Sequence, residues 1–223
     1  MATRLGTEAQ YYFSEASPGN ERKWLLWLQG GSACQTEESC KQRKASSPDL
    51  MGSADYPETI QNEGVLSKDD PTFGGWNQAF VKYCTSDFHL GDREASADET
   101  FGWHFRGQRV VKSVLKSLQA KGLRSGDTIV LSGCSAGAMG ATVLCDFVES
   151  WLPRSITDVK IACVLDSPLP LLHNLDGFVE YVSVWGELYG IRGVVIETCL
   201  AEFPADEAWR CYFPECEAVH QRV

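Results

Sequence analysis

Unbroken apolar runs alternate along the chain with segments of helical period. Trp24–Leu28 is an apolar run that stops at Gln29-Gly30-Gly31, a pattern typical of a buried strand that ends in a glycine-rich loop. Two further runs, Asp127–Ser132 and Val159–Leu165, predict two more strands, and Ala79–Cys84 favours another. Each of these runs has the length of a strand rather than of a helix.

Two amphipathic segments lie between these runs. In the first, 106–120, the apolar positions are Val110, Val111, Val114, Leu115 and Leu118, with Arg109, Lys112, Lys116 and Gln119 on the opposite helix face. Lys121-Gly122 closes this helix, with glycine at the left-handed cap position. A second helical pattern runs from Ala136 to about Trp151, directly after a predicted strand.

The order of the elements predicts the fold class. The segment 46–75 is rich in Ser, Asp, Pro and Gly without a sustained period, so it is expected to be mostly loop with short helical turns. No internal repeat or long linker divides the chain. Alternating strands and amphipathic helices therefore predict one α/β domain over 1–223, with a mainly parallel sheet and helices on both faces.

One short motif indicates a possible catalytic residue. Gly133-Cys134-Ser135-Ala136-Gly137 matches the Gly-x-Ser-x-Gly pattern of a nucleophile elbow. The pattern alone is weak, because about 0.1 chance matches are expected in a chain with 20 glycines among 223 residues. Its context is stronger, since a strand is predicted before it and a helix after it. We interpret Ser135 as a nucleophile rather than as a helix N-cap serine without chemistry.

Backbone N–H groups for an oxyanion are predicted at two places. The helix start at Ala136 leaves free N–H groups beside Ser135, at the positive end of the helix dipole. Gly30-Gly31-Ser32 has the form of the second donor loop, because glycine lets the backbone approach a substrate oxygen closely. A plain turn is the alternative for the two glycines. The strand-turn-helix pattern around Ser135 favours the oxyanion interpretation.

Composition limits the classes of binding partner and the cellular compartment that fit this chain. The chain has 20 Lys and Arg against 30 Asp and Glu, a net charge of -10 and no basic run, which argues against a nucleic-acid partner. No apolar run reaches the ~18 residues of a membrane span, and the first residues lack the apolar core of a secretory signal. Nine cysteines nevertheless indicate an oxidising compartment. The two observations are reconciled if the start shown is not the natural start or if a leader was left out of this chain.

The cysteine spacing suggests particular pairs. Cys34 and Cys40 are predicted to form a disulfide, because five intervening residues make a short loop whose ends can reach the ~5.5 Å Cα separation of a bridge. Cys199 and Cys211 are a weaker second pair. The spacing of Cys211, Cys216 and His220 fits no common zinc site, so disulfides or free thiols are favoured there. No metal or cofactor is expected.

A series of landmarks, in order along the chain, resembles the pectin acetylesterase and Notum family. The resemblance runs from about Tyr11 to Phe213 and is far more specific than the elbow alone. The landmarks are Tyr11-Tyr12-Phe13, Trp24–Cys34 with Cys40, Gly64–Ser67, Trp76-Asn77, Val81–Cys84, Leu90-Gly91-Asp92 and Leu131–Gly137.

The resemblance implies a fold and an activity. These are an α/β-hydrolase-like fold, secretion to the extracellular space or cell wall, disulfides, no metal, and hydrolysis of carboxylic esters. The esters are acetyl groups on pectin in one branch and palmitoleoyl groups on Wnt proteins in the other. Carried over, Ser135 is the nucleophile, while Gly31, Ser32 and Ala136 supply the oxyanion-hole N–H groups.

One departure from the family bears on the acyl group. Where the family usually has Gly-Gly-Gly-Trp-Cys or Gly-Gly-Trp-Tyr-Cys, this chain has Gly30-Gly31-Ser32-Ala33-Cys34, without the bulky aromatic. We therefore favour a short acyl group on a carbohydrate such as pectin. A palmitoleoyl-protein deacylase and a catalytically inactive ligand-binding homologue are the alternatives.

The acid and base that would activate Ser135 are not evident. In hydrolases of this fold the acid and then the histidine follow the serine, and only His173 and His220 do so here. From the residues alone, Asp166 at the end of a predicted strand and His220 would be chosen. The resemblance instead implies that the acid and base follow the Trp209–Phe213 landmark.

We follow the resemblance and expect the true acid and base to be absent from 1–223. The C-terminal part of the domain would then be missing, and the chain as it stands would hydrolyse esters poorly. His89 and His104 precede the elbow and are expected to be ordinary surface or loop histidines.

Overall fold

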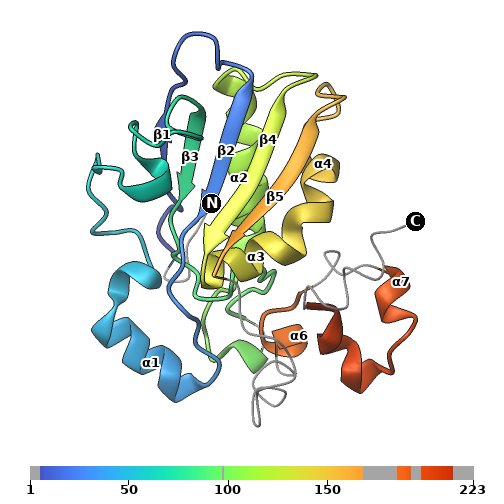
Figure 1. Cartoon of the computed structure of the whole chain (residues 1–223). Helices are drawn as coiled ribbons and strands as arrows, with labels where there is room; N and C mark the ends of the chain where they lie inside the picture. Colours follow the sequence, from blue (N-terminus) through green and yellow to red (C-terminus); the bar gives the residue numbers. More distant parts are fainter. Residues whose placement is uncertain (1–5, 97, 168–184, 192–196, 213–223) are drawn as a thin grey trace.

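The computed structural model describes residues 6–96, 98–167, 185–191 and 197–212, and within them five strands form one sheet (Figure 1). The strand order is β1-β3-β2-β4-β5. Strands β2, β3, β4 and β5 run parallel, and β1 pairs antiparallel with β3 at one edge. The expected mainly parallel α/β sheet is confirmed. The strand bounds are β1 Tyr11–Ser14, β2 Lys23–Leu28, β3 Asn77–Val81, β4 Thr128–Cys134 and β5 Lys160–Asp166.

Helices connect the strands much as the periodicity predicts. The helix expected over 136–151 is α3, a 3-10 turn and α4 in succession, and the segment 46–75 contains two 3-10 turns between loops. The α-helix bounds are α1 Glu37–Ser46, α2 Gly107–Ala120, α3 Ala136–Leu144, α4 Val148–Trp151, α6 Trp185–Leu188 and α7 Glu197–Leu200. The 3-10 helices are η1 Pro48–Leu50, η2 Gly64–Leu66, η3 Asp98–Thr100, η4 Cys145–Phe147 and η6 Ala205–Tyr212.

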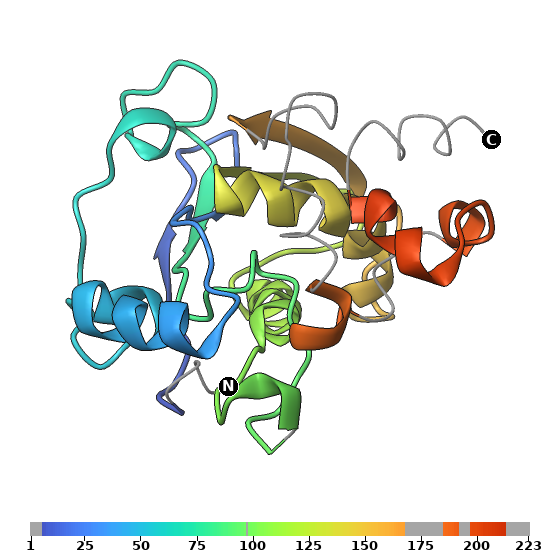
Figure 2. The same cartoon turned by 90° about the horizontal axis from the view of Figure 1, so that it is seen from below.

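The two faces of the sheet are covered differently. Alternate residues of β2 point to opposite faces, and Trp24, Leu26 and Leu28 lie in the main core with the apolar sides of α2 and α3. Both of these helices therefore lie on one side of the sheet (Figure 2). On the other side, Leu25 and Val130 pack against side chains of η2 and of the segment that leads to Trp76. In the part of the chain that the structure describes, the helical cover of this second face is η2.

Three disulfides occur among the described residues. The predicted pairs Cys34–Cys40 and Cys199–Cys211 are both present. The third, Cys145–Cys163, joins the end of α3 to β5 and was not predicted. Because Cys211 is bonded to Cys199, its sulfur is not a free thiolate for zinc; Cys216 and His220 lie outside the described residues.

Two of the described cysteines, Cys84 and Cys134, are free thiols. Burial raises the pKa of the Cys84 thiol to about 12, so at neutral pH it is a poor nucleophile towards alkylating reagents. None of the described helices has both the length and the apolar character needed to cross a membrane.

Peptide mapping without reduction is expected to recover all three disulfides. A glutamate-specific protease cuts at Glu37 and Glu38, so the fragments that carry Cys34 and Cys40 will stay joined only by their bridge. The same digest should contain a Cys145–Cys163 link, and iodoacetamide should alkylate Cys84 only after unfolding. Free thiols at both Cys145 and Cys163 in air-oxidised protein would contradict the packing of α3 on β5.

Candidate active site

Ser135 lies at a sharp turn between the last residue of β4 and the first residue of α3. Its φ of 54° and ψ of -119° fall outside the regions that L-residues normally adopt, a strain of about 1–3 kcal/mol that the surrounding structure must hold in place. The Ser135 N–H donates to the Asp166 carbonyl of β5 at 3.1 Å, and the Ser135 carbonyl accepts from the Met139 N–H at 3.0 Å. Ser135 is exposed although Gly133 and Ala136 are buried.

The two motif glycines permit close backbone contacts. A Cβ atom on Gly137 would lie 2.0 Å from the Leu28 carbonyl oxygen at the end of β2. A Cβ on Gly133 would lie 2.6 Å from the Gly137 carbonyl carbon and 2.7 Å from the same Leu28 oxygen. No side chain fits at such distances. The steric reason for glycine two positions either side of the serine is therefore present in the structure.

The loop that follows β2, Gln29–Cys34, lies directly against this turn, and we call it the donor loop. A Cβ on Gly30 would lie 2.4 Å from the Cys134 carbonyl oxygen and 3.2 Å from the Ser135 Cβ. The next two residues are left-handed, with φ of 143° at Gly31 and 57° at Ser32. Within the described part of the chain, no hydrogen bond occupies the backbone N–H of Gly31, Ser32 or Ala136. The donor loop and the start of α3 thus bring free N–H groups to the neighbourhood of Ser135.

His89 holds the beginning of the donor loop. Its Nε2 lies 2.9 Å from the Gln29 carbonyl oxygen, and because a carbonyl can only accept, Nε2 carries the ring proton. The ring stacks on Tyr83 with centroids 4.6 Å apart. His89 does lie in a loop, as expected, but it is buried rather than at the surface. Burial lowers the pKa of His89 to about 4, against the opposing effect of the hydrogen bond to Gln29.

The loop that carries His89 is fixed by a buried carboxylate. Asp87 accepts hydrogen bonds from the Thr85 hydroxyl at 2.6 Å and from the Gly107 N–H at 2.9 Å. Gly107 is the first residue of α2, so the negative carboxylate lies at the positive end of that helix. A Cβ on Gly107 would lie 2.3 Å from Asp87 Oδ1. The start of α2 therefore positions Asp87, and through it His89.

Asp166 supports the turn through its backbone. It is the exposed last residue of β5, next to Cys134 in the strand register. Its Oδ1 accepts a hydrogen bond from the Ser167 hydroxyl at 2.9 Å. Burial, followed by the charge of Asp166 and a hydrogen bond to it, raises the pKa of the Cys134 thiol. The Asp166 carboxylate thus already has two neighbouring polar partners.

None of the described histidines is hydrogen-bonded to Ser135. The His104 Nδ1 accepts from the Ala95 N–H at 3.0 Å, and the His89 ring is engaged by Gln29. His173 and His220 lie outside the described residues, so the structure leaves the pairing of Asp166 with His220 untested.

A serine on a strained strand-to-helix turn, at the carboxyl ends of a mainly parallel sheet and beside a glycine loop, defines an α/β-hydrolase-like fold. The family model of pectinacetylesterases matches residues 5–216. The chain belongs to the pectinacetylesterase family.

The chain is similar both to a protein named pectin acetylesterase and to proteins named Notum. The chain is 34% identical over 219 residues to pectin acetylesterase 11 of Arabidopsis thaliana, covering 94% of this chain and 53% of the relative. It is 30% identical over 221 residues to the human palmitoleoyl-protein carboxylesterase NOTUM, covering 93% and 44%. The structure of the Wnt deacylase Notum from Drosophila superposes with a TM-score of 0.82 at 28% identity, covering 97% of this chain and 63% of that chain. The chain spans about half the length of the curated relatives it matches.

Substitution of Gly137 by alanine is expected to lower the free energy of unfolding by about 3 kcal/mol or more, because the added methyl group overlaps a backbone carbonyl. The matched control is Gly64→Ala, where φ is 56° and nothing lies within 4 Å of the new Cβ. That control should cost only about 1 kcal/mol of backbone strain. Urea unfolding of the two variants measures the difference, and equal losses would contradict the close contact.

Lowering the pH is expected to destabilise the protein through His89. The folded pKa of about 4 lies below the ordinary 6.5, so the unfolded state binds a proton that the folded state does not. The free energy of unfolding is not reduced by this group above pH 6.5. As the pH falls towards 4, protonation of His89 in the unfolded state lowers it by about 3 kcal/mol at most. His89→Gln keeps a side-chain donor but does not titrate. Urea unfolding from pH 7.5 to 4.5 should show a smaller decline in this variant, and parallel declines would refute the assignment.

Proposed function

We propose that this chain carries the nucleophile and oxyanion hole of a serine carboxylic ester hydrolase. The observation that carries the proposal is the contact between the donor loop and the turn, where a Cβ on Gly30 would lie 3.2 Å from the Ser135 Cβ. An exposed serine, free N–H groups at the helix start and a second set of N–H groups must meet at one place for acyl transfer.

The proposed chemistry follows from these positions. The Ser135 Oγ attacks the ester carbonyl carbon as a base removes its proton, and the carbonyl oxygen becomes an oxyanion. The N–H of Ala136 and that of Gly31 or Ser32 stabilise this charge, and one such donor is worth about 3–4 kcal/mol in the transition state. The intermediate then expels the alcohol, which takes the proton, and water hydrolyses the acyl-serine.

In hydrolases of this fold the base is a histidine held by a carboxylate. His89 is committed to the donor loop and His104 to the Ala95 N–H, so neither is proposed. Asp166 and His220 are the weaker candidates that this chain itself offers. Contacts of Ser167 and Cys134 with the Asp166 side chain count against its use as the acid.

The proposed substrate is an acetylated polysaccharide such as pectin. The family match and the small side chains of Ser32 and Ala33 in the donor loop support a short acyl group. The likeness to the Notum structure supports the alternative, a palmitoleoyl-protein deacylase; a ligand-binding homologue without turnover is the third. Three disulfides favour an extracellular or cell-wall location.

Replacement of Ser135 by alanine is expected to abolish covalent labelling by a fluorophosphonate probe and to remove the low rate of p-nitrophenyl acetate hydrolysis that is expected of this chain. Ser150→Ala, an exposed serine on α4, is the matched control and should change neither. The labelled peptide should contain Ser135. Unchanged hydrolysis in Ser135→Ala would overturn the nucleophile assignment, and covalent labelling of Ser135 in the wild-type protein would count against the ligand-binding homologue.

The same hydrolysis assay also tests the length of the acyl group and the roles of Asp166 and His220. Faster hydrolysis of p-nitrophenyl acetate than of p-nitrophenyl octanoate is expected for a short acyl group, and the reverse would favour the deacylase. His220→Ala and Asp166→Asn should leave the rate unchanged if neither residue belongs to the triad.

A further inference from the structure

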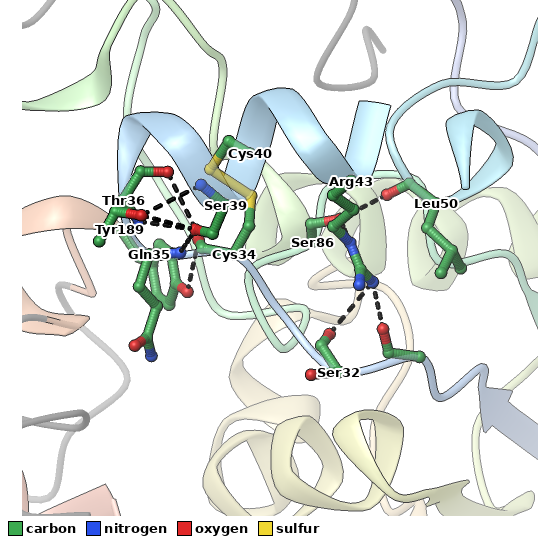
Figure 3. Close-up of a disulfide and its surroundings, with 11 residues drawn as sticks. Ser32, Cys34, Gln35, Thr36, Ser39, Cys40, Arg43, Leu50, Ser86 and Tyr189 are labelled. Carbon is green, nitrogen blue, oxygen red and sulfur yellow. Dashed lines mark hydrogen bonds between the residues drawn. A yellow bond between two sulfur atoms is a disulfide. The ribbon is translucent and has the colours of Figure 1, made fainter. Parts of the chain in front are cut away.

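Helix α1 is attached to the donor loop at two points (Figure 3). The Cys34–Cys40 disulfide joins the end of the loop to the helix. Arg43 follows Cys40 by three residues, so both side chains lie on the same face of the helix. Thr36 caps the helix by accepting a hydrogen bond from the Ser39 N–H at 3.1 Å. The helix is thereby held in a fixed orientation from which Arg43 reaches the loop.

The Arg43 guanidinium binds two successive carbonyl groups of the donor loop. Its Nη2 donates to the Gly31 carbonyl and makes a longer contact of 3.4 Å with the Ser32 carbonyl. Its Nε donates to the Ser86 hydroxyl at 2.6 Å, and that hydroxyl in turn donates to the Leu50 carbonyl at 2.6 Å. Ser86 is buried. The planar fork of Arg43 is therefore fixed on one side by Ser86 and binds the loop with the other.

The direction of these carbonyls decides the direction of the N–H groups. In a trans peptide the C=O and the N–H of the same unit point in opposite directions. Because Arg43 holds the Gly31 carbonyl, the Ser32 N–H points away from α1. Ser32 also has a φ of 57°, which is costly for a residue with a side chain, so the loop needs such a contact to keep this conformation.

We propose that Arg43 is a positioning residue that sets the Ser32 N–H as an oxyanion donor, a role that rests on the proposed function. Arg43 contacts the loop through its carbonyls and does not contact the substrate. Its removal should leave Ser135 in place but let the Gly31-Ser32 peptide rotate. The effect is therefore expected in kcat rather than in KM.

The matched variants are Arg43→Ala and Lys44→Ala. Both remove a basic side chain from the last turn of α1, but Lys44 lies over the Trp103 ring and does not bind the loop. Arg43→Ala should lower kcat for p-nitrophenyl acetate by about 10–100-fold with little change in KM, and millimolar methylguanidinium should restore part of it. A folded Arg43→Ala protein with kcat within twofold of Lys44→Ala would overturn the proposal.

A second readout does not depend on turnover. Amide hydrogen exchange at Cys34, whose N–H donates to the Ser86 carbonyl at 3.3 Å, should rise by about tenfold in Arg43→Ala and stay unchanged in Lys44→Ala, because Arg43 no longer joins the donor loop to Ser86. Unchanged exchange in Arg43→Ala overturns the positioning role. If exchange is faster in Arg43→Ala but hydrolysis survives Ser135→Ala, Arg43 still holds the donor loop. In that case only the proposed function is rejected.

Discussion

The contact between the end of β2 and the start of α3 is the constraint on which the rest of the site depends. A methyl group on Gly137 would lie 2.0 Å from the Leu28 carbonyl oxygen. This approach lets α3 begin directly beside the loop that leaves β2. It also forces the chain between β4 and α3 to reverse within one residue, which explains the unusual backbone of Ser135. The exposed serine and the adjacent helix start both follow from the same contact.

The donor loop is placed against this turn by contacts from distant parts of the chain. His89, fixed through Asp87 to the start of α2, binds the Gln29 carbonyl at one end. At the other end, the Tyr189 hydroxyl donates to the Cys34 carbonyl at 3.1 Å, although the two residues are 155 positions apart. Arg43 binds the carbonyls between them. These contacts direct the carbonyl groups towards the supporting elements, while the N–H groups of Gly31 and Ser32 stay free.

The parts of the fold with strong local patterns could be predicted from the sequence. The apolar run Trp24–Leu28, the helical face of 106–120 and the glycines around Ser135 each specify a structure within a few neighbouring residues. Helix α1 was not predicted, because only Cys40 of its residues is buried and its stability comes from the Thr36 cap and a disulfide. The strand predicted at 79–84 begins two residues earlier, at Asn77.

Contacts between distant segments could not be predicted. The Cys145–Cys163 bridge depends on the packing of α3 against β5, and neither segment reveals that packing by itself. Likewise, the burial of His89 and the reach of Arg43 depend on which loops the fold brings to the carboxyl edge of the sheet. A histidine in a polar loop segment gives no local signal of burial. Only the three-dimensional arrangement shows that both residues support the donor loop.

A crystal structure of the protein phosphonylated at Ser135 would show whether the donor loop and the start of α3 form the oxyanion hole. The phosphonyl oxygen stands in for the oxyanion of the tetrahedral intermediate. We expect this oxygen to lie about 2.7–3.1 Å from the Ala136 nitrogen and from the Gly31 or Ser32 nitrogen. A phosphonyl oxygen that points into solvent, with no nitrogen of the donor loop within about 4 Å, would contradict this expectation.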